Sequence, residues 1–247
     1  MSKSKIEWTE ETWNPTTGCT KVSAGCKHCY AETMAIRLKA MGTPGYENGF
    51  QFSIMPDRLE QPLKRKKPTK YFVNSMSDLF HEKMPKEYLD KVMDVIVKTP
   101  QHIYQILTKR EDRMFDYFSE RSSIPQNIWL GVTVEDIKNG VPRIDKLRTL
   151  DAKIKFLSVE PLLEDLKKIN LIGIDWVIVG GESGNKARPM KKEWAINIKL
   201  QCETQEVAFF FKQWGTWGAD GVKRSKKNNG RLLNGKEWNE YPELHLT

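Results

Sequence analysis

The run DWVIVGG at residues 175–181 begins with an aspartate, continues with four large apolar residues and ends in two glycines. A short, unbroken apolar run of this kind is typical of a strand that is buried on both faces of a parallel sheet. Similar runs occur at residues 71–74, 103–108, 128–134, 154–159 and 207–212. Most of them are separated by a segment of helical length with apolar residues three or four apart. This alternation predicts βαβ units.

One more short strand is expected near the N-terminus, at residues 6–8, which brings the count to six or seven. The sequence therefore predicts an α/β fold: a partial or near-complete (β/α) barrel of six or seven parallel strands with a C-terminal hairpin extension. A doubly wound open sheet has the same periodicity and remains an alternative. The strand rhythm stops near residue 215, so we expect the barrel at 1–214 and a basic, Trp-containing extension at 215–247. Its hairpin is centred on Asn234-Gly235.

The composition excludes several classes of protein. The chain has 247 residues, 39% hydrophobic content and eight tryptophans, which is unlike a disordered protein. It has no apolar run long enough for a membrane helix and no signal peptide, so we expect a cytoplasmic protein with no membrane partner. The net charge of +8 permits a polyanionic partner without requiring one.

Polar residues cluster directly after the C-terminal ends of the predicted strands. In a parallel barrel these ends face the same mouth, where substrate sites are built. Each one taken singly also fits a helix N-cap. The residues are Asn74, Ser75, Ser77, Asp78, Thr108, Lys109, Arg110, Thr133, Glu135, Ser158, Glu160, Gly180, Gly181, Glu182, Ser183, Lys212, Gln213 and Trp214.

Three of the four cysteines, Cys19, Cys26 and Cys29, lie within eleven residues. In a reducing compartment this density indicates metal ligands, because thiolates select zinc, copper(I) or iron–sulfur clusters. Zinc would need a fourth ligand such as His28 or Cys202. A four-iron cluster held by three cysteines would instead keep one iron open for a substrate or cofactor. The helical spacing around Cys202 favours a core position for that residue.

The segments Asn14-Pro15, Gly18-Cys19 and Cys26-x-x-Cys29-Tyr30-Ala31 resemble the cluster loop of radical S-adenosylmethionine enzymes, in the branch related to spore photoproduct lyase. The whole chain is also similar to a phage- and prophage-encoded family of three-cysteine proteins of unknown function. The first spacing departs from the usual pattern, since six residues separate Cys19 from Cys26 where most such enzymes have three.

The resemblance implies a 4Fe-4S cluster on the three cysteines, S-adenosyl-L-methionine, and an external electron donor such as flavodoxin or ferredoxin. It implies an enzyme of the lyase or transferase class. A tight turn with a surface glutamate is the alternative interpretation of the Gly-Gly-Glu segment. The residues expected to contact S-adenosylmethionine are His28, Tyr30, Asn74, Ser75, Ser77, Asp78, Lys109, Ser158, Glu160, Gly180, Gly181, Glu182 and Ser183.

Basic residues beside aromatic ones predict a nucleic acid or nucleotide substrate, with base modification or repair as the reaction. The photoproduct lyase resemblance implies the same class. A solvated charged face is the plainer explanation of the basic stretches. A zinc-stabilised nucleic-acid-binding protein without catalysis is the competing function. The residues expected to contact the substrate are Arg110, Lys186, Arg188, Lys212, Trp214, Lys223 and Arg224.

Overall fold

The computed structural model describes residues 2–4 and 6–243. The strands are β1 (Ser2–Lys3), β2 (Glu11–Trp13), β3 (Thr16–Thr17), β4 (Ser53–Ile54), β5 (Lys70–Val73), β6 (Ile103–Thr108), β7 (Ile128–Thr133), β8 (Ile154–Val159), β9 (Trp176–Gly180) and β10 (Ala208–Gln213). The α-helices are α1 (Tyr30–Ala40), α2 (Pro56–Leu59), α3 (Lys86–Val97), α4 (Glu111–Ser119), α5 (Gly140–Arg148), α6 (Lys192–Thr204) and α7 (Lys226–Asn229). Short 3-10 turns occur at Ala24–Cys26 and Pro62–Lys64.

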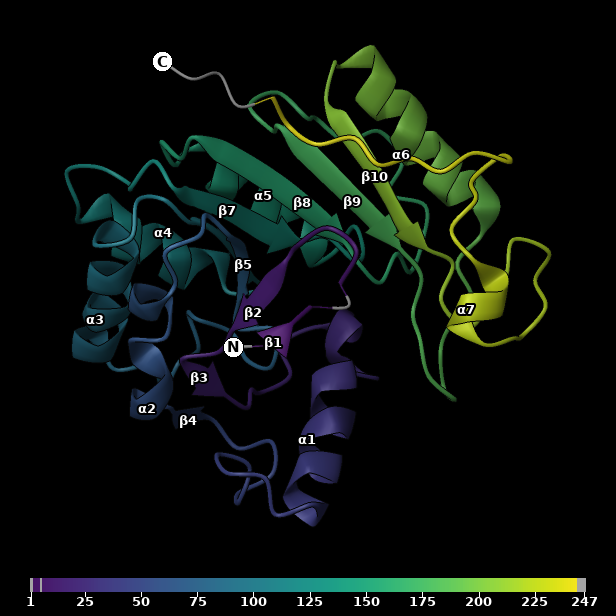
Figure 1. Ribbon diagram of the computed structural model, residues 1–247. Coiled ribbons are helices and arrows are strands. Elements are labelled where there is room, and N and C mark those ends of the chain that lie inside the picture. The colour runs from purple at the N-terminus through teal and green to yellow at the C-terminus, as the bar shows by residue number, and fades with distance from the viewer. Residues whose placement is uncertain (1, 5, 244–247) are drawn as a thin grey trace. The chain divides into compact units, whose positions relative to one another are not determined.

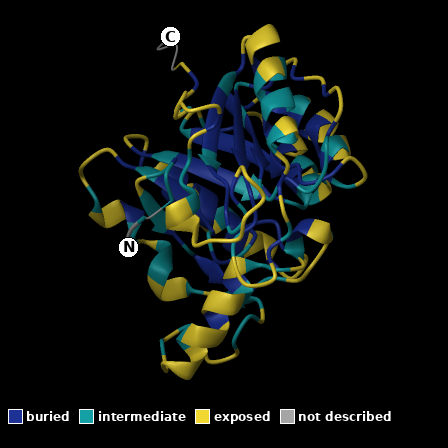
Figure 2. Ribbon diagram, turned by 90° about the vertical axis from the view of Figure 1, so that its right-hand side faces the viewer, coloured by how far each residue is buried: buried dark blue, intermediate teal, exposed yellow. Residues whose placement is uncertain are grey.

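The main sheet has the strand order β1-β2-β5-β6-β7-β8-β9-β10 (Figure 1). Seven of these strands are parallel, and β1 is added antiparallel to β2. This order confirms the predicted partial (β/α) barrel, because sequential strands are neighbours rather than reversing at a switch point as in a doubly wound sheet. Figure 2 shows that the strands are mostly buried and that the helices carry both exposed and less exposed residues.

The six strands predicted between residues 71 and 212 are confirmed within a residue or two, but the N-terminal strand was placed wrongly. The strand is β2, whereas residues 6–8 form the turn between β1 and β2, with the amide of Thr9 donating to the carbonyl of Ile6. Trp8 is buried because its ring packs on Phe72 at 4.7 Å. The apolar residues that suggested a strand are therefore part of a turn in which Trp8 is buried.

Contacts divide the chain into two compact units. The first contains residues 1–22, 29–131 and 150–153, as far as these are described. Its strands meet in a core of aromatic side chains: Trp13 on β2, Tyr71 on β5 and Tyr104 on β6 are fully buried. The Trp13 and Tyr104 rings meet edge-on at 5.5 Å. This packing fixes the C-terminal ends of β2, β5 and β6 beside one another.

The second unit contains residues 23–28, 132–149 and 154–247, as far as these are described. Helix α6 lies along β10 (Figure 1). Trp176 on β9 and Phe210 on β10 are buried, and their rings meet edge-on at 6.0 Å. Cys202 on α6 is fully buried, which confirms the core position predicted for it.

The C-terminal segment returns to the edge of the sheet and covers β10. The amide of Glu240 donates to the carbonyl of Phe209 (3.2 Å), and Trp176 Nε1 donates to the carbonyl of Glu240 (2.8 Å). The Tyr241 ring lies 5.1 Å from the Trp176 ring. The predicted hairpin is confirmed before this segment: Asn234 and Gly235 have φ angles of 53° and 77°, as a type I′ turn requires. The domain boundary at residue 214 stays a prediction.

Within residues 2–4 and 6–243, none of the helices is long and apolar enough to cross a bilayer.

We predict that removing residues 237–247 destabilises the protein and makes it associate. The truncation uncovers the β10 edge, and an unpaired edge strand is a template for pairing with another chain. The loss of the Tyr241 and Glu240 contacts, at about 2 kcal/mol, lowers the Tm of a chain of this size by about 4 °C or more. Thermal unfolding and light scattering measure the two effects, and an unchanged Tm would contradict the covering role.

Candidate functional site

The segment before Cys19 is fastened to the residues that follow β5. Asn14 Oδ1 accepts hydrogen bonds from Ser75 Oγ and from the amide of Met76, both at 3.1 Å. The amide of Gly18 donates to the carbonyl of Met76 (3.0 Å), and Ser77 Oγ donates to the carbonyl of Gly18 (2.6 Å). The Asn-Pro and Gly-Cys residues that carry the sequence resemblance therefore fix the start of the cysteine loop in the first unit.

Gly18 cannot be replaced without strain. Its φ of +75° lies in the left-handed region, and a Cβ there would meet the carbonyl oxygen of Gln51 at 2.1 Å. The amide of Cys19 then donates to the carbonyl of Phe50 at 3.1 Å. The loop can turn toward Cys19 because this position has no side chain.

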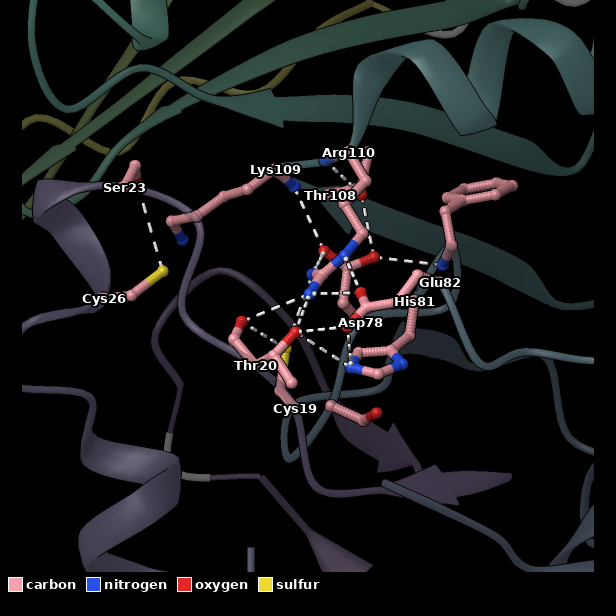
Figure 3. Close-up of polar contacts among 12 residues, drawn as sticks. Cys19, Thr20, Ser23, Cys26, Asp78, His81, Glu82, Thr108, Lys109 and Arg110 are labelled. Carbon is pink, nitrogen blue, oxygen red and sulfur yellow. Dashed lines mark hydrogen bonds and ion pairs between the residues drawn. The ribbon is translucent and has the colours of Figure 1, made fainter. Parts of the chain in front are cut away.

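A buried ion pair joins the residues after β5 and β6 to the first cysteine (Figure 3). Arg110 Nη1 lies 3.1 Å from Asp78 Oδ2, and each side chain is 8% exposed. The same nitrogen donates to Cys19 Sγ at 3.4 Å. Burial alone would lower the pKa of Arg110, but the charges of Asp78 and Cys19 raise it. Arg110 is therefore a permanent cation beside the Cys19 sulfur.

Thr20, the residue after Cys19, has a fully used hydroxyl. It donates to Glu82 Oε1 (2.7 Å) and accepts from Arg110 Nη2 (2.8 Å). His81 Nε2 lies 3.1 Å away. Burial, and then the charge of Arg110, lower the pKa of His81, so that its ring is neutral at neutral pH. Its Nδ1 accepts from the amide of Lys83, so the neutral ring carries its proton on Nε2 and donates to Thr20.

Glu82 completes this network as an ionised carboxylate. Arg110 Nε donates to Glu82 Oε2 at 3.1 Å. Burial acts against ionisation, but the hydrogen bond from Thr20 and the neighbouring charges lower the pKa of Glu82 to about 2. Sequence reasoning missed Thr20, His81 and Glu82. Adjacency to Cys19 was the available signal for Thr20, whereas nothing local marks the other two.

Cys26 and Cys29 have different surroundings. Within the second unit, Cys26 Sγ lies 3.9 Å from Ser23 Oγ, and Ser23 Oγ donates to the buried carboxylate of Glu135. Arg143 Nη1 pairs with the other Glu135 oxygen at 2.6 Å. Cys29 is the N-cap residue of α1 and packs against the apolar cluster of the first unit. Glu135 and Arg143 were not predicted as site residues, although Glu135 follows β7 as a strand-end residue.

The three loop thiols form no disulfide and are all partly exposed. Among residues 2–4 and 6–243, no three His, Cys, Asp or Glu side chains are arranged to hold a metal ion. The donor set nevertheless fits an iron–sulfur cluster, because three thiols on one short loop are soft ligands of the right number. Cys202 is a poor fourth ligand, since burial raises the pKa of its thiol strongly.

The predicted residues after β5 mainly build the loop. Ser75 and Ser77 hold Asn14 and Gly18, and Asp78 holds Arg110. Asn74 is 3% exposed, with its Oδ1 accepting from the amide of Thr16 (3.3 Å), while its Nδ2 has no hydrogen-bond partner. A buried amide donor without a partner is costly, and Asn74 carries such a donor directly after β5.

Two more predicted residues of the first unit lie near this segment. Tyr30 is 57% exposed, and its hydroxyl donates to the carbonyl of Ser75. The amide of Lys109 donates to Asp78 Oδ2 at 3.2 Å, and its side chain is partly exposed. In the second unit, His28 is also partly exposed.

The predicted residues after β8, β9 and β10 meet within the second unit. Ser158 Oγ donates to Glu160 Oε1 at 3.3 Å, and Glu160 Oε2 pairs with Lys212 Nζ at 2.6 Å. A Cβ on Gly180 would lie 3.0 Å from Glu160 Oε2. The expectation that these strand ends converge is confirmed for this group.

Glu182 is buried. It is 7% exposed, so it is not the surface glutamate of the alternative interpretation, while its contact with a cofactor stays a prediction. Arg188 binds both of its oxygens, through Nε at 2.9 Å and Nη2 at 2.5 Å, and the Arg188 amide donates to it as well. Ser183 Oγ lies 3.2 Å from Gln213 Nε2. Gly181 packs so closely that a Cβ would meet the carbonyl oxygen of Trp214 at 2.0 Å.

Several predicted substrate contacts are already engaged. Arg110 and Arg188 are held in the ion pairs described above, and Arg224 pairs with Asp220 at 2.6 Å. Trp214 is 2% exposed and its Nε1 donates to the carbonyl of Leu232, so the expectation of an exposed stacking ring at this position was wrong. Lys186 is exposed, and so is Lys223, whose ammonium donates to the carbonyl of Asn185 (2.7 Å).

We predict that Gly18→Ala destabilises the protein more than Gly42→Ala. Both glycines have left-handed φ angles, +75° and +67°, so each substitution carries a similar backbone strain of about 1 to 2 kcal/mol. A Cβ at Gly42 meets nothing within 4 Å, whereas one at Gly18 overlaps the Gln51 carbonyl. Urea unfolding should show a further loss of about 1 to 3 kcal/mol for Gly18→Ala. Equal losses would mean that the loop yields freely at this point.

Comparison with known proteins gives the following matches. The fold is similar to a variant of spore photoproduct lyase, with 16% identity over 73% of this chain and 58% of that chain and a TM-score of 0.48. A second match is a variant of that enzyme with bound AdoMet and dinucleoside spore photoproduct, with 14% identity over 81% of this chain and 62% of that chain and a TM-score of 0.47. The chain thus spans less than two thirds of the length of these proteins.

The comparison with curated proteins finds no match. The model of a family described as proteins of unknown function, DUF5131, matches residues 3–242, and the chain belongs to this family.

Proposed function

We propose that the protein is a radical S-adenosylmethionine enzyme whose 4Fe-4S cluster is held by Cys19, Cys26 and Cys29. The carrying observation is the loop itself: three partly exposed thiols that form no disulfide lie within eleven residues, after β2 of a partial (β/α) barrel. Loops after barrel strands are where cofactors and substrates bind. The hydrogen bonds of Asn14 and Gly18 support the proposal, because these residues of the resembling motif hold the start of the cysteine loop against the residues that follow β5.

The donor set fits a cluster with one open iron, since three thiolates leave the fourth iron without a protein ligand. When bound, the cluster and S-adenosylmethionine together supply a 5'-deoxyadenosyl radical for hydrogen-atom abstraction. The protein must bind and orient the cofactor and exclude water. Asn74 Nδ2, a buried donor without a partner, suits a carboxylate or an adenine nitrogen, and the exposed Tyr30 ring offers a stacking face.

The second group of strand-end residues suits polar parts of a ligand. Glu160 and Lys212 are 14% and 18% exposed, so their pair is sheltered yet reachable. A carboxylate accepts hydrogen bonds from ribose hydroxyls or an ammonium, and the lysine suits a phosphate. We retain Glu160 for cofactor binding and Lys212 for substrate binding as proposals. Glu182 is a weaker candidate than expected, because Arg188 already occupies both of its oxygens.

We predict that Cys19→Ala, Cys26→Ala or Cys29→Ala each abolishes the brown cluster after anaerobic reconstitution. Wild-type protein should hold about four iron and four sulfide per chain and release 5'-deoxyadenosine from S-adenosylmethionine when reduced. Cys202→Ala is the matched control and should keep full iron, because this thiol is buried on α6. One tightly bound zinc per chain and indifference to S-adenosylmethionine would establish the zinc-stabilised binding protein instead.

We further propose that the substrate is a nucleic acid or a nucleotide. Beyond the ion-paired arginines, several lysines are exposed, and those near the C-terminus lie close together in sequence. Lys223 Nζ sits 5.9 Å from the centre of the Trp217 ring, which puts a cation beside an aromatic face. Such pairs bind a phosphate and stack a base. The members of this C-terminal lysine group are Lys223, Lys226 and Lys227.

We predict that replacing the C-terminal lysine group by glutamine weakens nucleic-acid binding and flattens its salt dependence. Each lost phosphate contact lowers the slope of log K against log salt by about 0.9 for duplex DNA, so a change near 3 is expected. Lys91, Lys98 and Lys138 are also exposed, and their joint replacement removes the same charge as a control. Equal effects of the two triple variants would mean that the C-terminal lysine group is a solvated surface with no specific role in nucleic-acid binding. Salt-independent binding would exclude a polymer substrate.

A further inference from the structure

Arg110 lies at the C-terminal end of β6 and is almost fully buried, with a side chain that is 8% exposed. Two carboxylates hold it, Asp78 at 3.1 Å and Glu82 at 3.1 Å. A surface arginine could bind a substrate phosphate, as the sequence suggested. Arg110 is not available for this, because its N–H groups already donate to side chains and a carbonyl of the first unit.

The carboxylate of Asp78 is itself fixed. Its Oδ1 accepts from the amide of Phe80 (3.0 Å) and from Thr108 Oγ1 (2.7 Å), and its Oδ2 accepts from the amide of Lys109 (3.2 Å). A carboxylate that accepts this many hydrogen bonds is held in one orientation. The guanidinium bound to it is therefore aimed by the backbone of the residues after β5 and β6.

The other donors of Arg110 all point at the cysteine loop. Nη1 donates to Cys19 Sγ (3.4 Å), and Nη2 donates to the carbonyl and the hydroxyl of Thr20 (3.1 and 2.8 Å). Figure 3 shows the guanidinium between these loop atoms and the two carboxylates. The planar fork of arginine makes all these bonds at once, which a lysine ammonium cannot do with the same geometry.

We propose that Arg110 is a positioning residue for Cys19. It fixes the sulfur at the start of the loop before any cofactor is present, and it sets a permanent positive charge next to that sulfur. The first role concerns the protein alone. The second rests on the proposed function, because a cation that hydrogen-bonds a cluster thiolate stabilises the more negative, reduced cluster and raises its reduction potential.

Two variants separate the fork from the charge. Arg110→Lys keeps the charge and loses the fork, and Arg110→Gln loses both. Arg121→Gln is the matched control, because Arg121 also pairs with a carboxylate, Asp90, in the first unit, and its Nη1 donates to the carbonyl of Tyr117 rather than to Cys19 or Thr20. Far-UV circular dichroism establishes that each variant is folded.

The first measurement is amide hydrogen exchange in the metal-free protein. We expect the amide of Cys19, which is bonded to the Phe50 carbonyl, to exchange at least tenfold faster in both Arg110 variants and at the wild-type rate in Arg121→Gln. Unchanged protection in Arg110→Gln would overturn the positioning role. This result is independent of whether the protein binds a cluster.

The second measurement is the reduction potential of the reconstituted cluster. We expect Arg110→Gln to lower the equilibrium constant for one-electron reduction about tenfold, which is a shift of about 59 mV to more negative potential. Arg110→Lys should keep most of the wild-type potential although its loop is loosened, a pattern that a merely structural role does not produce. Equal potentials in wild type and Arg110→Gln would overturn the electrostatic role. If wild type takes up no cluster, the proposed function and the electrostatic role fail, and the exchange result alone decides the positioning role.

Discussion

The buried ion pair between Asp78 and Arg110 is the interaction on which the arrangement around Cys19 depends. Bringing two charges out of water costs several kcal/mol, and the cost is recovered only when their remaining donors and acceptors are satisfied. Here they are satisfied by backbone amides after β5 and β6 on one side and by Cys19 and Thr20 on the other. The same bonds that make the ion pair tolerable therefore order the loop, and neither partner can be removed without leaving a buried charge.

The fold was predictable because strand burial is written locally in the sequence. Runs such as residues 103–108 and 154–159 are mostly apolar, with two polar residues in each, and they became β6 and β8 with unchanged ends. The error at residues 6–8 has the same origin, since Trp8 is buried in a turn and a short apolar pattern cannot distinguish a buried turn from a strand. The apolar pattern shows which residues are buried. Whether a buried segment is a strand depends on hydrogen bonds to neighbouring strands, which the pattern does not show.

The candidate site was predictable in position but not in its pairings. The residues after the strands were expected at a common edge, and Glu160 with Lys212 meet this expectation. Which charged groups satisfy one another depends on side-chain geometry between segments far apart in the chain. Arg110 therefore looked like a substrate contact and is held by Asp78, and Glu182 looked like a cofactor contact and is held by Arg188.

The Gly-Gly-Glu segment shows that the same sequence pattern can serve close packing of the backbone or the binding of a ligand. A side chain does not fit at Gly181, because a Cβ there would lie 2.0 Å from the carbonyl oxygen of Trp214. Gly215 has a φ of +81°, and a Cβ there would lie 2.2 Å from the carbonyl oxygen of Glu182. Close approach of a backbone and close approach of a ligand select the same residue, because both need the space that a Cβ would fill. Glycines after a barrel strand thus point to a close neighbour of either kind. The cysteine loop is less ambiguous, because three partly exposed thiols close in sequence are soft metal ligands in the number that a cluster needs.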